Sequence, residues 1–263
     1  MLSFPATIIR VCVHTSGVRM SQPSPLRQPV PPPRQAGRRS YGGVAPEERQ
    51  ALRRQRLIEA GIEVFGTRGF HAATVREVCG AARLTERYFY ESFKGLPDLF
   101  AAVFEHITGM LKTATLLALA KSEPLPLKLA EAGLRCFLEF VREDPRRARI
   151  ALIDAVSIGQ GSKEAVDRTS RDYVDLMRGF VGTLYPDAAK AGINVEMLSV
   201  GLIGMNTHIA TSWVRDGCKM PLEDVLASNL LCYSGLDMLV RSRGVEVVPG
   251  ARPPKAAGRR KAS

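Results

Sequence analysis

Residues 74–94 read TVREVCGAARLTERYFYESFK, and this stretch decides the fold of the chain. Thr74-Val-Arg-Glu77 is a capping box, in which the threonine side chain accepts from the Glu77 backbone N–H and the glutamate accepts from the Thr74 N–H. The box predicts a short helix that ends near Leu84, after which Thr85 offers a second N-cap. Two short helices joined by so brief a turn predict a helix-turn-helix, whose second helix enters the major groove of DNA.

The second short helix has an apolar side and a polar side. We expect Phe89 and Phe93, one turn apart, to pack against the first short helix and Phe65. The opposite side carries Thr85, Arg87, Tyr88 and Glu91. We expect Arg87 and Tyr88 to read bases, helped by Thr85, because a bidentate arginine–guanine pair gives about 1–3 kcal/mol of discrimination.

Helical periodicity extends through the rest of the folded part. Apolar residues spaced as in an amphipathic helix, from Leu57 to Phe65, follow a polar run and predict a first helix that ends near residues 65–68. Similar stripes predict helices at about 97–121, 130–141, 145–158, 162–184, 193–215 and 221–241. Strand-like alternation is missing from the sequence, so the expected fold class is all-α, with an N-terminal three-helix helix-turn-helix domain followed by a larger helical domain.

The amino-acid composition limits the class of protein and the cellular compartment in which it is expected. The chain has 263 residues, 45% of them hydrophobic, which is enough for a sizeable core. Its longest uncharged stretch, 197–214, contains several polar side chains, so we expect no membrane span and no membrane partner. The N-terminus is a poor secretory signal, because Arg10 interrupts its short apolar stretch. The five cysteines are odd in number and widely spaced, which favours the reducing cytoplasm.

The net charge of +11 lies in the two ends of the chain. Residues 1–46 contain six arginines and no acid, residues 242–263 carry a net +5, and residues 47–241 sum to zero. Both ends are rich in Pro and Gly and predict disordered basic segments. Such segments often serve only as solubilising linkers, but they leave open an alternative function, an architectural DNA-binding protein that relies on its tails.

A family resemblance rests on residues in a specific order. The motifs are Arg56-Leu-Ile-Glu-Ala-Gly-Ile-Glu-Val-Phe65, Gly69-Phe70, Thr74-Val-Arg-Glu-Val78, Ala81-Ala82, Leu84-Thr85 and Tyr90-Glu-Ser-Phe93-Lys94. Over residues 47–96 the chain closely resembles the DNA-binding domain of TetR-type transcriptional regulators. The resemblance implies a homodimer and a C-terminal domain, residues 97–241, that binds a small-molecule effector and dimerises. The implied function is a ligand-responsive repressor of a palindromic operator.

The remaining DNA contacts are expected on phosphates. A helix N-terminus directs free N–H groups and a positive dipole end at an anion, so Thr74 and Arg76 are expected to contact a phosphate. Tyr90 and Lys94 match family positions that grip the DNA backbone. Arg83 departs from the family, which usually has glycine in the turn, and a left-handed arginine there costs about 1 kcal/mol. Gly61 and Gly80 lie inside predicted helices and predict close approach of neighbouring helices.

An effector cavity is expected in the C-terminal domain. The candidate lining residues are His106, Ile107, Met110, Cys136, Met205, Asn206, His208 and Trp213. Helix 193–215 is apolar around much of its circumference and must be covered on several sides, and the family resemblance implies that it forms a four-helix dimer interface with helix 221–241. Phosphate loops, hydrolase elbows and metal-spaced histidines are missing from the sequence, so we expect no catalysis, no metal and no cofactor. A helical enzyme with an appended helix-turn-helix stays as a third hypothesis.

Overall fold

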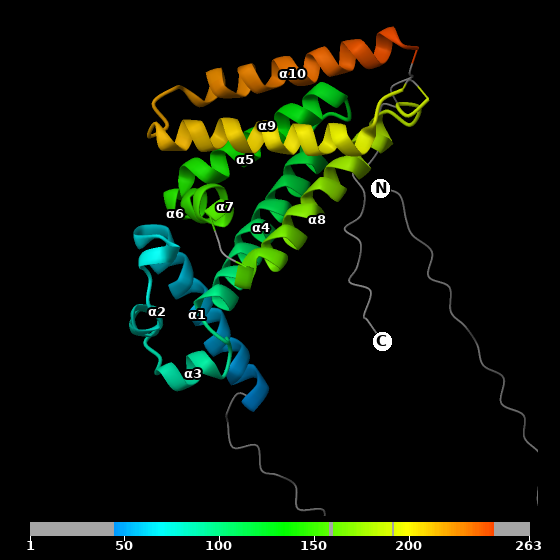
Figure 1. Cartoon of the computed structure of the whole chain (residues 1–263). Coiled ribbons are helices and arrows are strands. Elements are labelled where there is room, and N and C mark those ends of the chain that lie inside the picture. Colours follow the sequence, from blue (N-terminus) through cyan, green and yellow to red (C-terminus); the bar gives the residue numbers. More distant parts are fainter. Residues whose placement is uncertain (1–44, 158–159, 191, 245–263) are drawn as a thin grey trace, which may run out of the picture. The chain divides into compact units, whose positions relative to one another are not determined.

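The computed structural model describes residues 45–157, 160–190 and 192–244, and within these ranges it contains helices and no strand (Figure 1). The predicted all-α class is therefore confirmed. The elements are α1 (Pro46–Arg68), η1 (Phe70–Ala72), α2 (Val75–Ala82), α3 (Glu86–Tyr90), α4 (Leu96–Lys121), α5 (Pro126–Glu143), α6 (Pro145–Ala148), η2 (Arg149–Asp154), α7 (Ala155–Ser157), α8 (Gln160–Leu184), α9 (Val195–Arg215) and α10 (Leu222–Ser242). The predicted basic ends lie almost wholly outside the described residues.

The α1–α3 unit forms as the sequence predicts. The Thr74 side chain accepts from the Glu77 N–H at 3.3 Å, and Glu77 Oε2 accepts from the Thr74 N–H at 3.0 Å, which confirms the capping box. Arg83 ends α2 in the left-handed region, with φ 52°. Thr85 occupies the N-cap of α3, as expected, but its side chain makes no capping bond.

The core of this unit continues into α4. Phe89 is fully buried beside Phe93, with ring centroids 5.9 Å apart, and Phe65 packs against Phe100 of α4 at 5.5 Å. A Cβ added to Gly61 would lie 2.7 Å from Val103 Cγ2, so this glycine does allow close approach of α1 and α4. The same expectation for Gly80 is wrong, because an added Cβ there would meet nothing within 4 Å. One helix, α4, therefore belongs to the cores of both domains.

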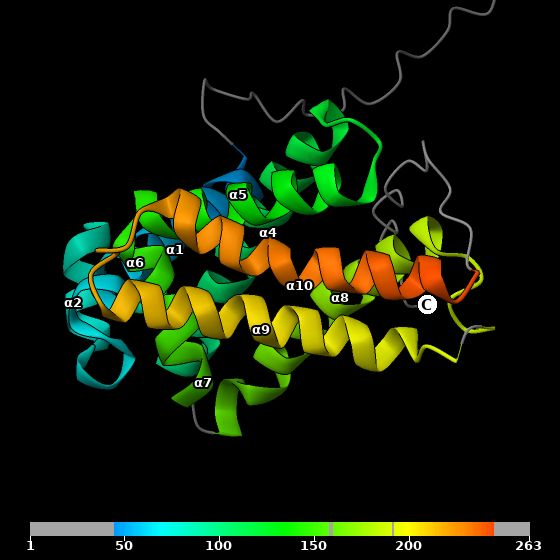
Figure 2. The same ribbon diagram turned by 90° about the horizontal axis from the view of Figure 1, so that it is seen from above.

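The C-terminal domain is a bundle closed by its last two helices. Figures 1 and 2 show α9 and α10 side by side and antiparallel, and they pack on α8 and α5 respectively. The outward faces of this α9–α10 pair carry large apolar side chains that are 44–74% exposed. They are Met197, Val200, Leu231, Met238 and Leu239. None of the described helices is long and apolar enough to cross a membrane.

The region predicted as one helix at 145–158 is divided. The short α6 passes into η2, a π-helix, and then into α7. Arg149, at the start of η2, donates to the carbonyls of Thr67 and Arg68 at 3.2 and 3.3 Å, and these carbonyls belong to the last turn of α1. Asp154, at its end, accepts from the Phe70 backbone N–H at 3.0 Å. The π-helix is therefore fastened at both ends to the α1–α3 unit, which is called the DNA-binding unit below because the sequence predicts that role.

Glycine makes the contact between α1 and α6 possible. The backbone of Arg146 in α6 lies so near Gly66 that an added Cβ would be 2.8 Å from the Arg146 Cα and 2.2 Å from its Cβ. The Arg146 guanidinium reaches back to Glu63 of α1 and to Asp144, which caps α6. The hydrogen bonds and the charge of Arg146 hold the pKa of the Asp144 carboxyl below its usual value.

Candidate DNA-binding surface and ligand cavity

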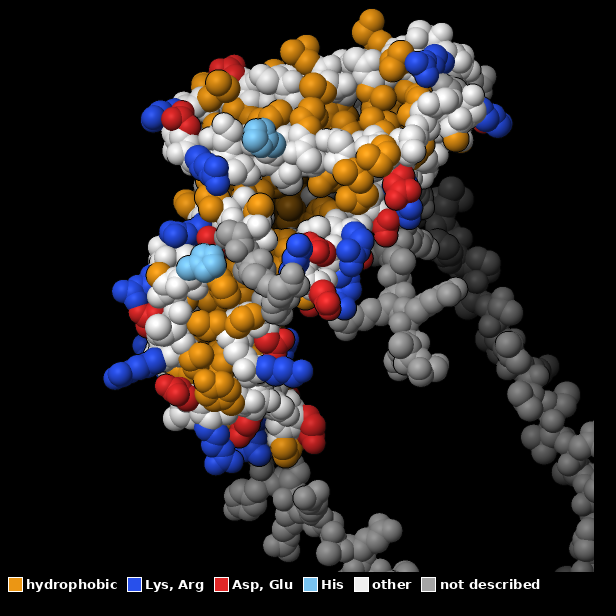
Figure 3. Space-filling view, viewed as in Figure 1, with side chains coloured by type: hydrophobic (Ala, Val, Ile, Leu, Met, Phe, Trp, Pro, Cys, Tyr) orange, Lys and Arg blue, Asp and Glu red, His pale blue; other side chains and the backbone are white. Residues whose placement is uncertain are grey.

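The seven predicted DNA-contact residues all lie in α2, α3 or the turns that flank them. Six are exposed and Tyr88 is half-buried. They are Thr74, Arg76, Thr85, Arg87, Tyr88, Tyr90 and Lys94. In Figure 3 Lys and Arg side chains project around the α1–α3 end of the molecule, among Asp and Glu side chains. This end offers exposed cations and hydroxyls on short helices, which suits contact with a nucleic acid.

Arg87, a candidate base-reading residue, is strongly exposed and forms an ion pair. Its side chain is 85% exposed, and its Nε donates to Glu91 Oε1 at 3.1 Å. Glu91 also lies 3.8 Å from the guanidinium of Arg53 in α1. An ion pair exposed to this extent contributes about 0–1 kcal/mol, so it does not prevent Arg87 from turning towards another partner.

Tyr88 and Tyr90 differ in their surroundings. The guanidinium carbon of Arg53 lies 4.5 Å from the centre of the Tyr88 ring, so Tyr88 is held against α1 by a cation–π contact. Tyr90 is 59% exposed and packs edge-on against Phe89, with ring centroids 5.3 Å apart.

Lys94 lies just before α4. Its backbone N–H donates to Asp98 in the first turn of α4 at 3.0 Å, and the Lys94 side chain is exposed.

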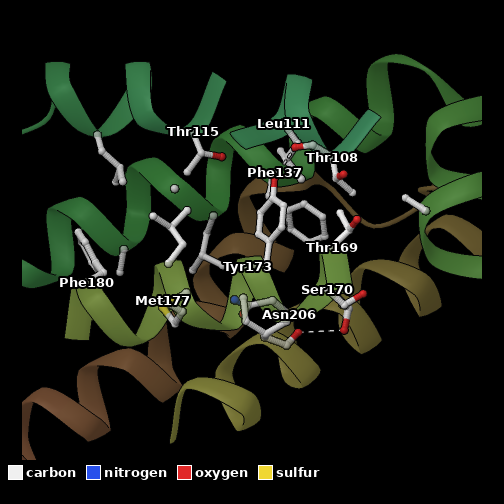
Figure 4. A pocket seen from close by; sticks show the side chains of 18 of the residues that line it. Thr108, Leu111, Thr115, Phe137, Thr169, Ser170, Tyr173, Met177, Phe180 and Asn206 are labelled. Carbon is white, nitrogen blue, oxygen red and sulfur yellow. Dashed lines mark hydrogen bonds between the residues drawn. The ribbon is translucent and has the colours of Figure 1, made fainter. Parts of the chain in front are cut away.

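A cavity of about 240 Å³ lies in the C-terminal domain among α4, α5, η2, α8, α9 and α10 (Figure 4). Its lining residues are Phe104, Thr108, Leu111, Thr115, Leu119, Leu129, Ala130, Gly133, Leu134, Phe137, Ala151, Leu152, Thr169, Ser170, Tyr173, Leu176, Met177, Phe180, Ile203, Asn206, Thr207 and Tyr233. Neither an acidic, a basic nor a histidine side chain occurs among these described residues. Its size approaches the range of about 300–1,000 Å³ that is usual for small-molecule sites.

Hydrogen bonds occupy most polar groups of the cavity wall. Tyr173 of α8 donates its O–H to the backbone carbonyl of Thr108 in α4 at 2.7 Å, and burial raises the pKa of this phenol. Thr108 itself donates to the Phe104 carbonyl at 2.7 Å. Asn206 donates from Nδ2 to the Tyr233 hydroxyl at 2.8 Å, but its Oδ1 is buried and has no hydrogen-bond partner. Asn206 Oδ1 is therefore a buried acceptor that is free to receive a hydrogen bond in this uncharged wall.

Of the residues predicted to line a cavity, Asn206 does so, and the seven others are absent from the described lining. These seven are His106, Ile107, Met110, Cys136, Met205, His208 and Trp213. Ile107 is buried in the core that α4 shares with the DNA-binding unit, and Trp213 donates its indole N–H to the Met220 carbonyl at 2.9 Å. For α4 the reason is which face of the helix points into the cavity. This helix has two apolar stripes, and the one through Phe104 and Leu111 faces the cavity, whereas Ile107 lies on the other.

The wall that α8 contributes was not among the predictions from the sequence. Thr169, Tyr173, Met177 and Phe180 line the cavity from this helix, three or four residues apart. That spacing marks one face of a helix and was available as a signal. Figure 4 shows these side chains on the side of the cavity opposite Leu111 and Thr115 of α4. Among the described residues, no cluster of His, Cys, Asp and Glu side chains could hold a metal ion.

Comparison with known proteins agrees with this geometry. Residues 57–103 match the family described as bacterial regulatory proteins, tetR family. The chain is 24% identical over 187 residues to the HTH-type transcriptional activator FasR of Mycolicibacterium smegmatis, which covers 70% of this chain and 80% of that one.

Two solved structures share the fold. One is the transcriptional regulator FadR from Bacillus subtilis in complex with stearoyl-CoA, with a TM-score of 0.60 and 16% identity over 71% of this chain and 97% of that one. The other is AibR in complex with isovaleryl coenzyme A and operator DNA, with a TM-score of 0.52 and 16% identity over 68% and 96% of the two chains. Together with the geometry described above, the match over residues 57–103 shows a helix-turn-helix of the TetR type followed by a larger helical domain.

Proposed function

We propose that the chain is a ligand-responsive repressor that binds a palindromic operator as a homodimer and releases it when an acyl thioester enters the cavity. The observation that carries the proposal is that a helix-turn-helix and an uncharged cavity share α4, through Phe100 and Leu99 on one side and Phe104 and Leu111 on the other. A group that enters the cavity therefore contacts the helix on which the DNA-binding unit packs.

The proposed DNA contacts divide by role. Arg87, with Thr85 and Tyr88, reads bases, while Thr74, Arg76, Tyr90 and Lys94 contact phosphates. The exposure of Arg87 and the unused capping capacity of Thr85 support this division. Because Tyr88 is held by Arg53, we expect its ring edge, and not its face, to reach the groove.

Binding-site selection tests the assignment. Arg87→Ala should cost about 1–3 kcal/mol and relax specificity at one position of each half-site, because a bidentate base contact is lost. Lys94→Ala should weaken binding to all sequences similarly and lower the salt dependence, since it removes one phosphate contact. If Arg87→Ala and the parent select the same motif, the division of roles is wrong.

The homodimer is proposed from the α9–α10 pair. Its outward faces leave five large apolar side chains exposed, and a second copy related by a twofold axis would cover them. Such a dimer would place two recognition helices about 34–36 Å or somewhat more apart, as two successive half-sites require.

The ligand class follows from the cavity chemistry and the relatives. Without a cation in the described lining, the cavity offers nothing to neutralise a carboxylate, whereas an acyl chain esterified to a thiol is neutral at the carbonyl. The relatives that bind stearoyl-CoA and isovaleryl coenzyme A support an acyl-CoA here. We expect the acyl chain to lie in the cavity and the coenzyme to remain outside it.

Two routes connect the cavity to the DNA-binding unit. Phe104 and Leu111 of α4 line the cavity, and so do Ala151 and Leu152 of η2, whose ends are fastened to α1 and η1. A ligand that favours one position of α4 and η2 changes the spacing of the recognition helices. A coupling of about 1–3 kcal/mol, a 5- to 150-fold change in operator affinity, is the usual range.

Operator binding with and without stearoyl-CoA tests the switch. After an operator has been selected, its affinity should fall at least about 5-fold at saturating stearoyl-CoA. Free stearate, which keeps its carboxylate, should have a smaller effect at equal concentration. An increase in affinity would support activation by DNA binding in place of repression, and an unchanged affinity would refute the acyl-CoA response.

A further inference from the structure

The carboxamide of Asn206 is a polar group without full hydrogen bonding in a cavity wall that carries hydroxyl groups but no charge. Asn206 is only 8% exposed, and it donates to Tyr233 while its Oδ1 has no partner. Buried acceptors are rarely left in this state, because an unmade hydrogen bond costs more than a normal one contributes. In a site that binds ligands, such an atom marks a place where the ligand can supply the missing donor.

The Asn206–Tyr233 pair can both accept and donate. In the observed orientation Asn206 Oδ1 accepts, and the Tyr233 hydroxyl, which receives the Asn206 N–H, still has its own proton to give. If the amide is turned over, its nitrogen donates instead. A hydroxyl group on the ligand complements either arrangement, because it is at once a donor and an acceptor. An unsubstituted hydrocarbon complements neither.

The position of the pair places this group along the acyl chain. Tyr233 lines the main cavity and also a smaller pocket of about 20 Å³ bounded by Leu202 and Leu236. Met177 and Phe180 line both spaces as well. The pair therefore lies where the two spaces adjoin, among side chains that otherwise contact hydrocarbon, and not beside charged groups that would bind a coenzyme.

We infer that Asn206 and Tyr233 form a hydrogen-bonding site for a hydroxyl group carried on the acyl chain, so that the effector is a hydroxyacyl thioester. This inference rests on the proposed acyl-CoA response and narrows its ligand class. Asn206 and Tyr233 are then the residues that determine specificity for a neutral polar substituent inside the cavity.

The test compares stearoyl-CoA with a positional series of hydroxystearoyl-CoA isomers by calorimetry on the full chain. At least one isomer should bind about 10-fold more tightly than stearoyl-CoA, which corresponds to about 1.4 kcal/mol. The double variant Asn206→Leu, Tyr233→Phe should lose this preference, so that no hydroxystearoyl-CoA isomer binds more tightly to it than stearoyl-CoA does. Asn229→Leu is the matched control, because Asn229 is also a buried asparagine with an unpartnered Oδ1 but does not line the cavity.

Two results would overturn the inference while leaving the acyl-CoA response intact: equal affinity for all isomers in the parent, or a hydroxyl preference that survives in the double variant. Failure of every thioester to bind would refute the acyl-CoA response instead. A ligand-free measurement then still decides about the pair. If it serves a ligand, the double variant should melt at a higher temperature than the parent, because apolar replacement of both partners removes the unsatisfied amide. A lower melting temperature would show a structural pair and refute the inference.

Discussion

Replacing Gly66 by alanine should weaken the coupling between the cavity and the DNA-binding unit. The added methyl group would lie 2.2 Å from the Arg146 Cβ and 2.8 Å from its Cα, and neither atom can turn away as the end of a flexible side chain could. Non-bonded carbons rest about 3.5–4.0 Å apart, so α1 and α6 must separate by more than about 1 Å at this point. The separation acts on η2, which continues from α6 and carries Ala151 and Leu152 of the cavity wall.

The stability change should be small compared with the functional one. Overpacking a close contact costs about 1–3 kcal/mol, but alanine favours a helix by about 1 kcal/mol over glycine, so the net loss should be about 0–2 kcal/mol. If the proposed coupling between ligand and operator, about 1–3 kcal/mol, passes through this contact, it should fall by at least half.

The assay is operator affinity with and without the thioester, alongside unfolding by urea. Gly109→Ala is the control, because Gly109 also lies in a helix but a Cβ there would meet nothing within 4 Å. It should gain up to about 1 kcal/mol of stability and keep its ligand response. If Gly66→Ala responds to ligand like the Gly109 variant, the α1–α6 contact does not carry the signal.

Three further predictions address assembly, the turn and acid stability. Leu231→Glu should convert the dimer to monomers in sedimentation, whereas Leu117→Glu, at a similarly exposed leucine of α4, should not; a dimeric Leu231 variant would place the interface elsewhere. Arg83→Gly should raise the free energy of unfolding in urea by about 1 kcal/mol by relieving the left-handed conformation, and an unchanged value would show that this conformation is not strained. Because the folded-state pKa of Asp144 is lowered, its charge stabilises the protein above its unfolded pKa of about 3.9, and this contribution disappears as pH falls through the lower folded value. Asp144→Asn should therefore lose less stability than the parent between about pH 5 and pH 3 in urea titrations, and equal losses would show that the Arg146 contact is unimportant.

The helices could be predicted because their signals are local. The capping box at Thr74, the apolar stripe that ends at Phe65 and the Pro97-Asp98 start of α4 all act within a few residues, and the structure places helix boundaries beside them. The left-handed Arg83 was also predictable, since the turn between α2 and α3 requires that conformation.

The lining of the cavity could not be predicted from the apolar stripe of one helix, because it depends on how the helices pack against one another. Ile107 and Phe104 both belong to apolar stripes of α4, and only the packing of α1 on one side and α8 on the other decides which stripe meets a ligand. The division of 145–158 into α6, η2 and α7 has the same origin. No glycine or proline interrupts residues 149–154, and the π-helix coincides with contacts from Arg149 and Asp154 to residues more than eighty positions away.

The pairing of Arg87 with Glu91 has a consequence for how the protein would search a chromosome. At a site that presents no guanine to Arg87 in the proposed reading position, Glu91 would keep the arginine weakly paired and its carboxylate would repel the neighbouring phosphates. The protein would then remain for a shorter time at each wrong position and scan more positions in a given time. At the proposed operator a base edge would displace Glu91 from the guanidinium, so Glu91 would shorten the search at the cost of weaker binding to random DNA.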